Sequence, residues 1–112
     1  TLWPMVGALG GTGYGTDRLQ RFGYLTLTGA RDSLLLRAGE AVPAHEFHYW
    51  DCTDCGADLT AIKANGRTWP CGFAGERLYA AFPHFHWGGE IPMAARFVQA
   101  AETYREEKQH EA

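Results

Sequence analysis

The stretch "RFGYLTLTGA", residues 21–30, decides the fold because its side chains alternate with a period of two. Leu25 and Leu27 are separated and flanked by threonine and tyrosine side chains. In a β-strand, successive side chains point to opposite faces, so this alternation is the pattern of a strand with one buried face. The stretch therefore predicts a half-buried strand whose leucines face a core.

A second alternating stretch, "AHEFHYWD" at residues 44–51, predicts a partner strand. Its aromatic and titratable side chains divide between two faces because the period is again two. The predicted faces are His45, Phe47 and Tyr49 on one side, and Glu46, His48 and Trp50 on the other.

Shorter signals complete the predicted strands and turns. Clustered glycines cannot hold regular structure cheaply, and an Asn-Gly pair between apolar runs is a strong hairpin signal. The predicted segments are a buried strand at Pro4–Leu9, a loop at Gly10–Asp17, a turn with an apolar insert at 31–43, a hairpin at 58–69 turning at Asn65 and Gly66, and a strand at 77–87.

The last segment, residues 90–112, predicts a helix. Pro92 lies near its start, where a missing N–H costs little. Apolar side chains at spacings of three and four favour packing of the helix on the sheet. These side chains are Ile91, Ala94, Ala95, Val98 and Ala101. The polar run that follows predicts a frayed tail over about 105–112.

The whole pattern predicts one partial α/β domain with an α+β-like arrangement, in which five or six strands precede a C-terminal helix. The chain has 112 residues and a net charge of -3, with scattered basic residues, so we expect no binding to nucleic acid or to a membrane. It begins within an apolar segment and without an initiator methionine, so we expect a piece of a longer polypeptide.

The three cysteines allow several interpretations. Their odd number disfavours a disulfide framework, so we expect free thiols. Cys52 and Cys55 are spaced C-x-x-C, and with Cys71 and either His84 or His86 they could make a Cys3His zinc site, although the spacing is half of a zinc signature. The alternative to a zinc site is that these thiols lie on a loop and have no functional role. Neighbouring aspartates disfavour a redox thiolate, and the residues around Cys71 do not form a nucleophile elbow.

The histidines lie in two short motifs. "HEFHY" places Glu46 and His48 on one strand face, and "HFH" places His84 and His86 on one face of another. Each histidine alone is typical of a structural hydrogen-bond partner. Two such motifs on neighbouring strands raise the expectation of a functional site.

Read together, "RLQRFGY", "HEFHY", "YAAFPHFHW" and the closing helix resemble the C-terminal part of the cobyrinic acid a,c-diamide synthase family, from about Pro4 to about Tyr104. The resemblance implies the sheet-rich second half of a class I glutamine amidotransferase domain. In that family an N-terminal ATP-dependent synthetase domain precedes the amidotransferase. The whole protein would be a cytoplasmic ligase of cobalamin biosynthesis that uses ATP, Mg²⁺ and glutamine to amidate the a and c carboxylates of cobyrinic acid. ATP and Mg²⁺ would bind outside this chain.

The resemblance also implies a role for His84, as the base that takes the proton from a nucleophilic cysteine. That cysteine should lie in a Gly-x-Cys-x-Gly elbow upstream, and none of the three cysteines matches it. The nucleophile half and the synthetase domain would thus be absent, and the chain alone would be inactive. His86 occupies the place of the usual triad glutamate, so either His86 or Glu46 would support His84.

Two other expectations follow from such a partial domain. It would expose sheet edges and apolar surface, which favours a homo-oligomer. A stand-alone interaction domain that keeps the scaffold and has lost catalysis remains a further alternative, as does a small zinc-binding module.

Overall fold

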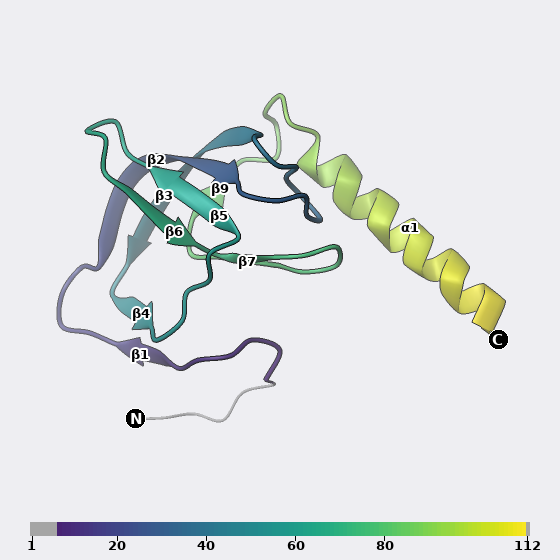
Figure 1. Ribbon diagram of the computed structural model, residues 1–112, viewed down its shortest axis with the longest axis horizontal. Coiled ribbons are helices and arrows are strands. Elements are labelled where there is room, and N and C mark those ends of the chain that lie inside the picture. Colours follow the sequence, from purple (N-terminus) through teal and green to yellow (C-terminus); the bar gives the residue numbers. More distant parts are fainter. Residues whose placement is uncertain (1–6, 112) are drawn as a thin grey trace.

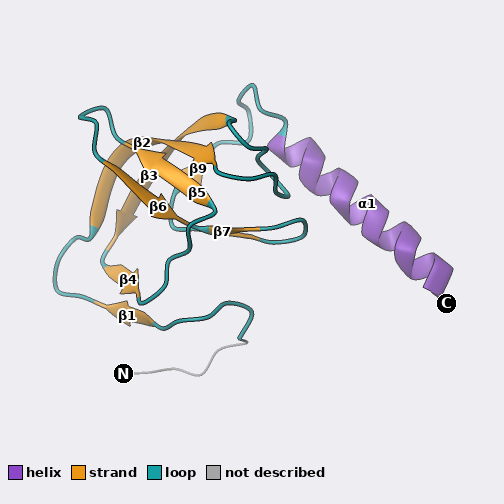
Figure 2. Cartoon of the chain, viewed as in Figure 1, coloured by secondary structure: helices purple, strands orange, loops and turns teal. Residues whose placement is uncertain are grey.

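A five-stranded antiparallel sheet forms the centre of the computed structural model, which describes residues 7–111 (Figures 1 and 2). Its strand order is β6-β5-β2-β3-β9. The bounds are β2 Arg21–Gly29, β3 Ala41–His48, β5 Leu59–Ile62, β6 Thr68–Cys71 and β9 His84–Phe85. Two small antiparallel pairs flank the sheet, β1 Gly13–Gly15 with β4 Trp50–Cys52, and β7 Phe73–Ala74 with β8 Tyr79–Ala80. The helix α1, Met93–Glu111, follows. The expected sheet-rich fold with a C-terminal helix is confirmed.

The inner face of the sheet carries the core. Leu25 lies opposite Ala44, and Leu27 lies opposite Val42, in the register of β2 with β3. Leu27 is fully buried. The other members of the core come from the sheet, from the apolar insert before β3 and from the start of α1; they are Leu35, Leu36, Leu59, Ala61, Cys71, Ala74 and Met93.

Two sequence predictions are confirmed in detail. The alternating stretch at 21–30 forms β2, with its leucines buried. The Asn-Gly hairpin forms between β5 and β6, where Gly66 has a φ of +88° and the Lys63 N–H donates to the Arg67 carbonyl. Only glycine adopts that backbone conformation at low cost, which explains the residue at this turn. The stretch at 44–51 divides into the later part of β3, which begins earlier at Ala41, and β4.

The glycine-rich segment at Gly10–Asp17 is not wholly loop as predicted, because it contains β1. β1 pairs with β4, and Thr12 and Thr53 exchange backbone and side-chain hydrogen bonds at its end. β4, which is distant in sequence, thus supplies the hydrogen bonds that hold β1. The low strand propensity of glycine could not predict this pairing. Of the predicted strand at Pro4–Leu9, residues 4–6 lie outside the described residues, and residues 7–9 form no strand.

The predicted strand at 77–87 is in fact two short strands with different partners. β8 pairs with β7, whereas β9 pairs with β3. Pro83 lies between them, and its ring removes the N–H that a continuous ladder would need. The chain therefore changes from one sheet to another at this residue.

The prediction that α1 packs along the sheet is wrong. Figure 1 shows the helix extending away from the sheets. Met93 is 1% exposed, but Phe97 and Val98 are each 55% exposed. The first turn anchors the helix, and the axis then leaves the body. No helix in the described part of the chain has the length and apolar character needed to cross a membrane.

The helix also begins later and ends later than predicted. It starts at Met93 rather than residue 90, and it continues through residues 105–111, where the sequence predicts fraying. Arg77 contacts Glu107, and residues 105–111 consist of arginine, glutamate, lysine, glutamine and histidine with no glycine or proline. Most of these residues favour helix, which accounts for the longer element.

The first turn of α1 is held by a bidentate ion pair. Arg96 Nη1 and Nη2 lie 2.5 and 2.9 Å from the two Glu40 oxygens, and Nη1 also donates to the Leu35 carbonyl. The Arg96 hydrogen bond, helped by the backbone N–H of Arg37, lowers the pKa of Glu40 to about 2. Because both side chains are only partly exposed, this pair ties the helix to the segment before β3.

Acid should weaken this tie. The folded-state pKa of Glu40 lies below its ordinary value of 4.5, so the pair stabilises the fold fully above that pH and progressively less as the pH falls toward 2. At neutral pH, Glu40→Gln should lower the free energy of unfolding by about 1 kcal/mol. Urea unfolding from pH 7 to pH 2 checks this. The difference from wild type should shrink with acid, whereas Glu90→Gln, at an exposed position, should change little. A Glu40→Gln effect that is independent of pH would contradict the assignment.

Candidate functional site

Three ring side chains form a row across the outer face of the sheet. Tyr24, His45 and His84 lie opposite one another on β2, β3 and β9. The ring centroids are 6.4 Å apart for Tyr24 and His45, and 5.1 Å apart for His45 and His84. All three side chains are exposed. The predicted base His84 therefore has an open side from which another group could approach.

The two residues predicted to support His84 lie elsewhere. Glu46 is buried on the inner face, because it alternates with His45, the direct partner of His84. His86 follows the end of β9, and its Nδ1 accepts the Gly88 N–H at 3.1 Å. The structure instead brings His45 beside His84. The sequence predicted that His45 shares a strand face with Phe47. It did not predict the contact of His45 with His84, because that contact depends on the pairing of β3 with β9.

Glu46 and His48 meet on the inner face, as their spacing of two predicts. His48 Nε2 lies 3.8 Å from Glu46 Oε1, and the His48 ring stacks on Phe82 with centroids 4.0 Å apart. Glu46 is 3% exposed, and burial raises the pKa of its carboxyl group. Among the described residues, Glu46 Oε2 and His48 Nε2 have no hydrogen-bond partner. A buried polar atom without a partner is costly, so this pair needs an explanation.

A cavity of about 350 Å³ lies against this pair. Its wall is built from the glycine-rich segment that leads into β1, from β4 and the loop after it, from the ends of β3 and β6, and from the turn before β9. The residues that matter for its chemistry are Arg21, Glu46, His48, Asp51, Asp54 and Cys71, and its large apolar side chains are Leu9, Trp69, Pro70, Phe73 and Phe82.

Cys71 is an unreactive thiol in this setting. It is 6% exposed and free of any disulfide. Burial, followed by the nearby charge of Glu46, raises the pKa of its thiol to about 11. Since the thiolate is the nucleophile, Cys71 stays neutral near pH 7.

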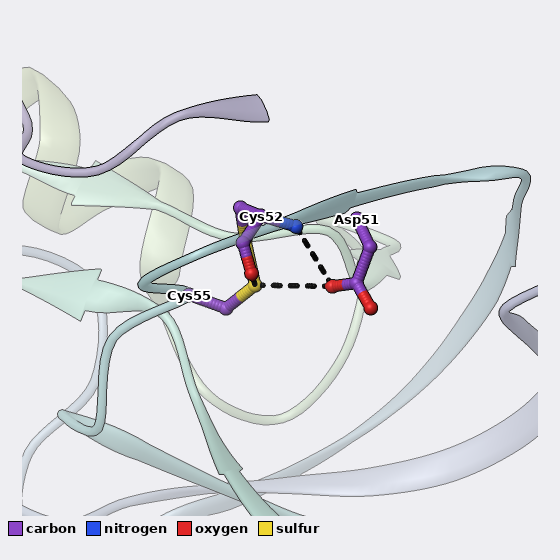
Figure 3. Close-up of side chains that lie close together, drawn as sticks. All are labelled: Asp51, Cys52 and Cys55. Carbon is purple, nitrogen blue, oxygen red and sulfur yellow. Dashed lines mark hydrogen bonds between the residues drawn. A yellow bond between two sulfur atoms is a disulfide. The ribbon is translucent and has the colours of Figure 1, made fainter. Parts of the chain in front are cut away.

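Cys52, Cys55 and Asp51 form a compact cluster at one side of the cavity (Figure 3). The two cysteines are joined by a disulfide, with Cα atoms 5.6 Å apart. The expectation of free thiols is wrong for this pair, because the turn between them brings the Cα atoms within the range of a disulfide. Asp51 Oδ1 accepts the Cys52 N–H at 2.8 Å and lies 3.5 Å from Cys55 Sγ. The sequence identified Asp51 only as a charge near the thiols.

The structure brings only some of the predicted zinc ligands close together. Within the described residues, the group with ligand atoms close enough to share a metal ion is Asp51, Cys52 and Cys55, all within 4.8 Å of one another. Cys71, His84 and His86 lie outside it. Zinc binds thiolates, so this group could hold a metal only after reduction of the disulfide.

The loop that carries these cysteines is tied to the end of β6. The Gly72 N–H donates to the Cys55 carbonyl at 2.5 Å, and Gly56 has a φ of +82°. A Cβ at Gly56 would collide with the backbone of Gly72. Gly56 is therefore required by a close approach of two backbones, which fixes the cluster beside Cys71 and the cavity. At Gly72, which has a φ of +77°, a Cβ would instead collide with the Leu59 side chain.

Comparison with known proteins confirms the resemblance seen in the sequence. The chain is 35% identical over 108 residues to a hydrogenobyrinate a,c-diamide synthase of Thermobifida fusca, covering 91% of this chain and 23% of that protein. It is 38% identical over 79 residues to a cobyrinate a,c-diamide synthase of Fusobacterium nucleatum (66% and 16%), and 30% over 105 residues to one of Listeria monocytogenes (89% and 23%). The chain thus spans less than a quarter of the length of these curated relatives. No protein-family model matches it, and no solved structure does.

Proposed function

We propose that this chain is the C-terminal portion of a cobyrinate a,c-diamide synthase, and that it forms the sheet-rich second half of the glutamine amidotransferase domain. Similarity over 89% of the chain to a protein named cobyrinate a,c-diamide synthase supports the proposal. The whole protein would be a cytoplasmic ligase that uses ATP, Mg²⁺ and glutamine-derived ammonia to amidate the a and c carboxylates of cobyrinic acid. ATP and Mg²⁺ would bind on the part of the protein outside this chain.

His84 would supply the base of the glutaminase reaction. Its imidazole would take the proton from a cysteine thiol on the preceding part of the protein, and the sulfur would then attack the side-chain carboxamide carbon of glutamine. The carbon–nitrogen bond would break, and the imidazolium would return the proton to the departing ammonia. Water would hydrolyse the resulting thioester to glutamate. The chain alone would lack the nucleophile and would not hydrolyse glutamine.

The observation that carries this role is the open position of His84 on the outer face. A base that acts on a thiol outside the chain must present its ring to an incoming segment. His84 is exposed, and its neighbour His45 contacts it from within the sheet rather than covering it. Glu46 is on the opposite face and His86 Nδ1 accepts the Gly88 N–H, so orientation of His84 would come from His45.

The test is an assay of the whole protein that contains this chain. Its reading frame should supply a Gly-x-Cys-x-Gly elbow and an ATP-binding domain upstream of Thr1. The purified protein should convert cobyrinic acid to its a,c-diamide with ATP, Mg²⁺ and either glutamine or ammonia. A reading frame that starts close to Thr1 would reject the enzyme and favour a stand-alone interaction domain.

A zinc-binding module remains a second candidate, and the approach of Asp51, Cys52 and Cys55 within 4.8 Å favours it. The sequence predicted Cys71 and either His84 or His86 as further ligands; these lie outside the group, and Asp51 would take their place. Metal analysis of protein purified under reducing conditions without added zinc tests this proposal. Near-stoichiometric zinc that is lost together with the fold on chelation would support it, and metal-free folded protein would reject it.

We expect the isolated chain to self-associate. The outer face of β2 and β3 exposes Phe22, Tyr24 and Phe47 by 60% or more, and α1 exposes Phe97 and Val98 by 55%. Exposed apolar surface of this kind favours association. Light scattering of the purified chain should therefore give a mass of at least twice 12.4 kDa. A monodisperse monomer would contradict the expectation.

A further inference from the structure

The cavity beside Glu46 and His48 contains buried hydrogen-bond acceptors without a donor. Glu46 Oε2 has no partner among the described residues, and its side chain is 3% exposed. A carboxylate oxygen in this position would normally be paired with a cation or an N–H group. The question is which donor reaches it.

His48 cannot satisfy both oxygens. Its Nδ1 lies 2.7 Å from the carbonyl oxygen of Trp50, which can only accept, so Nδ1 carries a proton. In the neutral ring, Nε2 is then itself an acceptor. If the ring is protonated, Nε2 is still 3.8 Å from Glu46 Oε1, beyond the usual length of a hydrogen bond. In either state Glu46 Oε2 remains without a donor.

Within residues 7–111, the two cations whose charges act on Glu46 are engaged elsewhere. Arg21 lies over the Trp69 ring at 4.8 Å and donates to the Gln20 carbonyl. Lys63 Nζ donates to the Phe22 carbonyl at 2.5 Å. Both charges act on the pKa of Glu46, but neither side chain forms a hydrogen bond with it. A donor from outside the described chain therefore fits the site.

The rest of the cavity indicates what such a donor would carry. Besides Glu46, the carboxylates of Asp51 and Asp54 line the described wall of the cavity with the guanidinium of Arg21, so the local charge favours a cation over an anion. A volume of about 350 Å³ greatly exceeds that of a single ammonium ion. Aromatic and aliphatic side chains cover much of the remaining wall, which suits an apolar body.

We propose that this cavity binds a primary ammonium group carried on an apolar body. Both acceptor atoms, Glu46 Oε2 and His48 Nε2, are buried, so their side chains turn toward the cavity as the ammonium group enters, and two of its N–H groups then donate to them. The apolar part lies against Trp69 and Phe82. The site is distinct from His84, which lies on the other face of the sheet. It does not depend on glutaminase activity, so its failure would leave the proposed function standing.

Three probes of similar shape test the site on the chain as it stands. Benzylamine presents an ammonium group, benzyl alcohol a neutral hydroxyl and benzoate a carboxylate. Calorimetric titration should show saturable binding of benzylamine, with binding of the other two at least about tenfold weaker, which is the scale of one charged hydrogen bond. Equal binding of benzyl alcohol, or no binding of benzylamine, would overturn the proposal.

Variants separate the site from non-specific attraction. Glu46→Gln keeps the size of the side chain and removes its charge, so it should weaken benzylamine binding at least about tenfold. Glu76→Gln, the same change at an exposed position outside the cavity, should leave binding unchanged. Unaltered binding by Glu46→Gln would overturn the proposal.

A spectroscopic measurement on the wild-type chain covers the case in which Glu46→Gln does not fold. The ring-nitrogen NMR signals of His48 should move on addition of benzylamine and stay in place on addition of benzoate. Signals that respond to neither probe, or equally to both, would also overturn the proposal.

Discussion

Replacing His84 with asparagine in the whole protein is expected to lower the glutamine-dependent amidation rate by about 10²–10⁴-fold, the usual contribution of a general base. Asparagine keeps a polar side chain of similar reach but cannot accept the thiol proton. The same variant should keep most of its activity when ammonia replaces glutamine, because free ammonia bypasses the glutaminase step. Initial rates with each nitrogen source measure the two effects separately.

The control for this experiment is His110→Asn, a matched change on the exposed end of α1, far along the chain from the ring row. It should leave both rates unchanged. Equal losses with glutamine and ammonia in His84→Asn would indicate damage to the fold or to the amidation step. An unchanged glutamine-dependent rate would remove His84 from the mechanism.

Truncation of Leu27 to alanine should have the largest effect on stability, a loss of about 2–5 kcal/mol in the free energy of unfolding. Leu27 is fully buried on β2, where it lies opposite Val42 of β3 and Ala61 of β5. Its removal would leave a cavity between three strands whose backbones are fixed by the sheet. Because small domains are marginally stable, this loss would be a large part of the total free energy of unfolding.

Urea unfolding followed by circular dichroism measures this effect. Leu78→Ala removes the same atoms from a side chain that is 39% exposed, and it should cost less than about 1 kcal/mol. Similar losses for the two variants would show that Leu27 does not occupy the centre of the core.

Local patterns predicted the parts of this fold that depend on local chemistry. The alternation around Leu25 and Leu27 was enough to predict β2, and Asn65 with Gly66 was enough to predict the hairpin. The packing of α1 was not predictable, because an apolar stripe shows which face is apolar but not whether a surface meets it. The division of the strand at Pro83 depended on which partner strand each half could reach.

The candidate sites show the same limit. The contact between Glu46 and His48 follows from a spacing of two within one strand. The contact between His45 and His84 depends on the register of two strands that are distant in sequence, which no local pattern contains. The disulfide depends on the path of a turn, so the C-x-x-C spacing alone left free thiols, a metal site and a redox pair as alternatives.

The departure of α1 from the body has a practical consequence. A helix of 19 residues extends about 28 Å, so its far end is a natural handle for surface attachment. A biotin or dye coupled there would leave both faces of the sheet accessible to solution, which makes immobilised chain suitable for comparing ligands at the cavity with partners at the ring row.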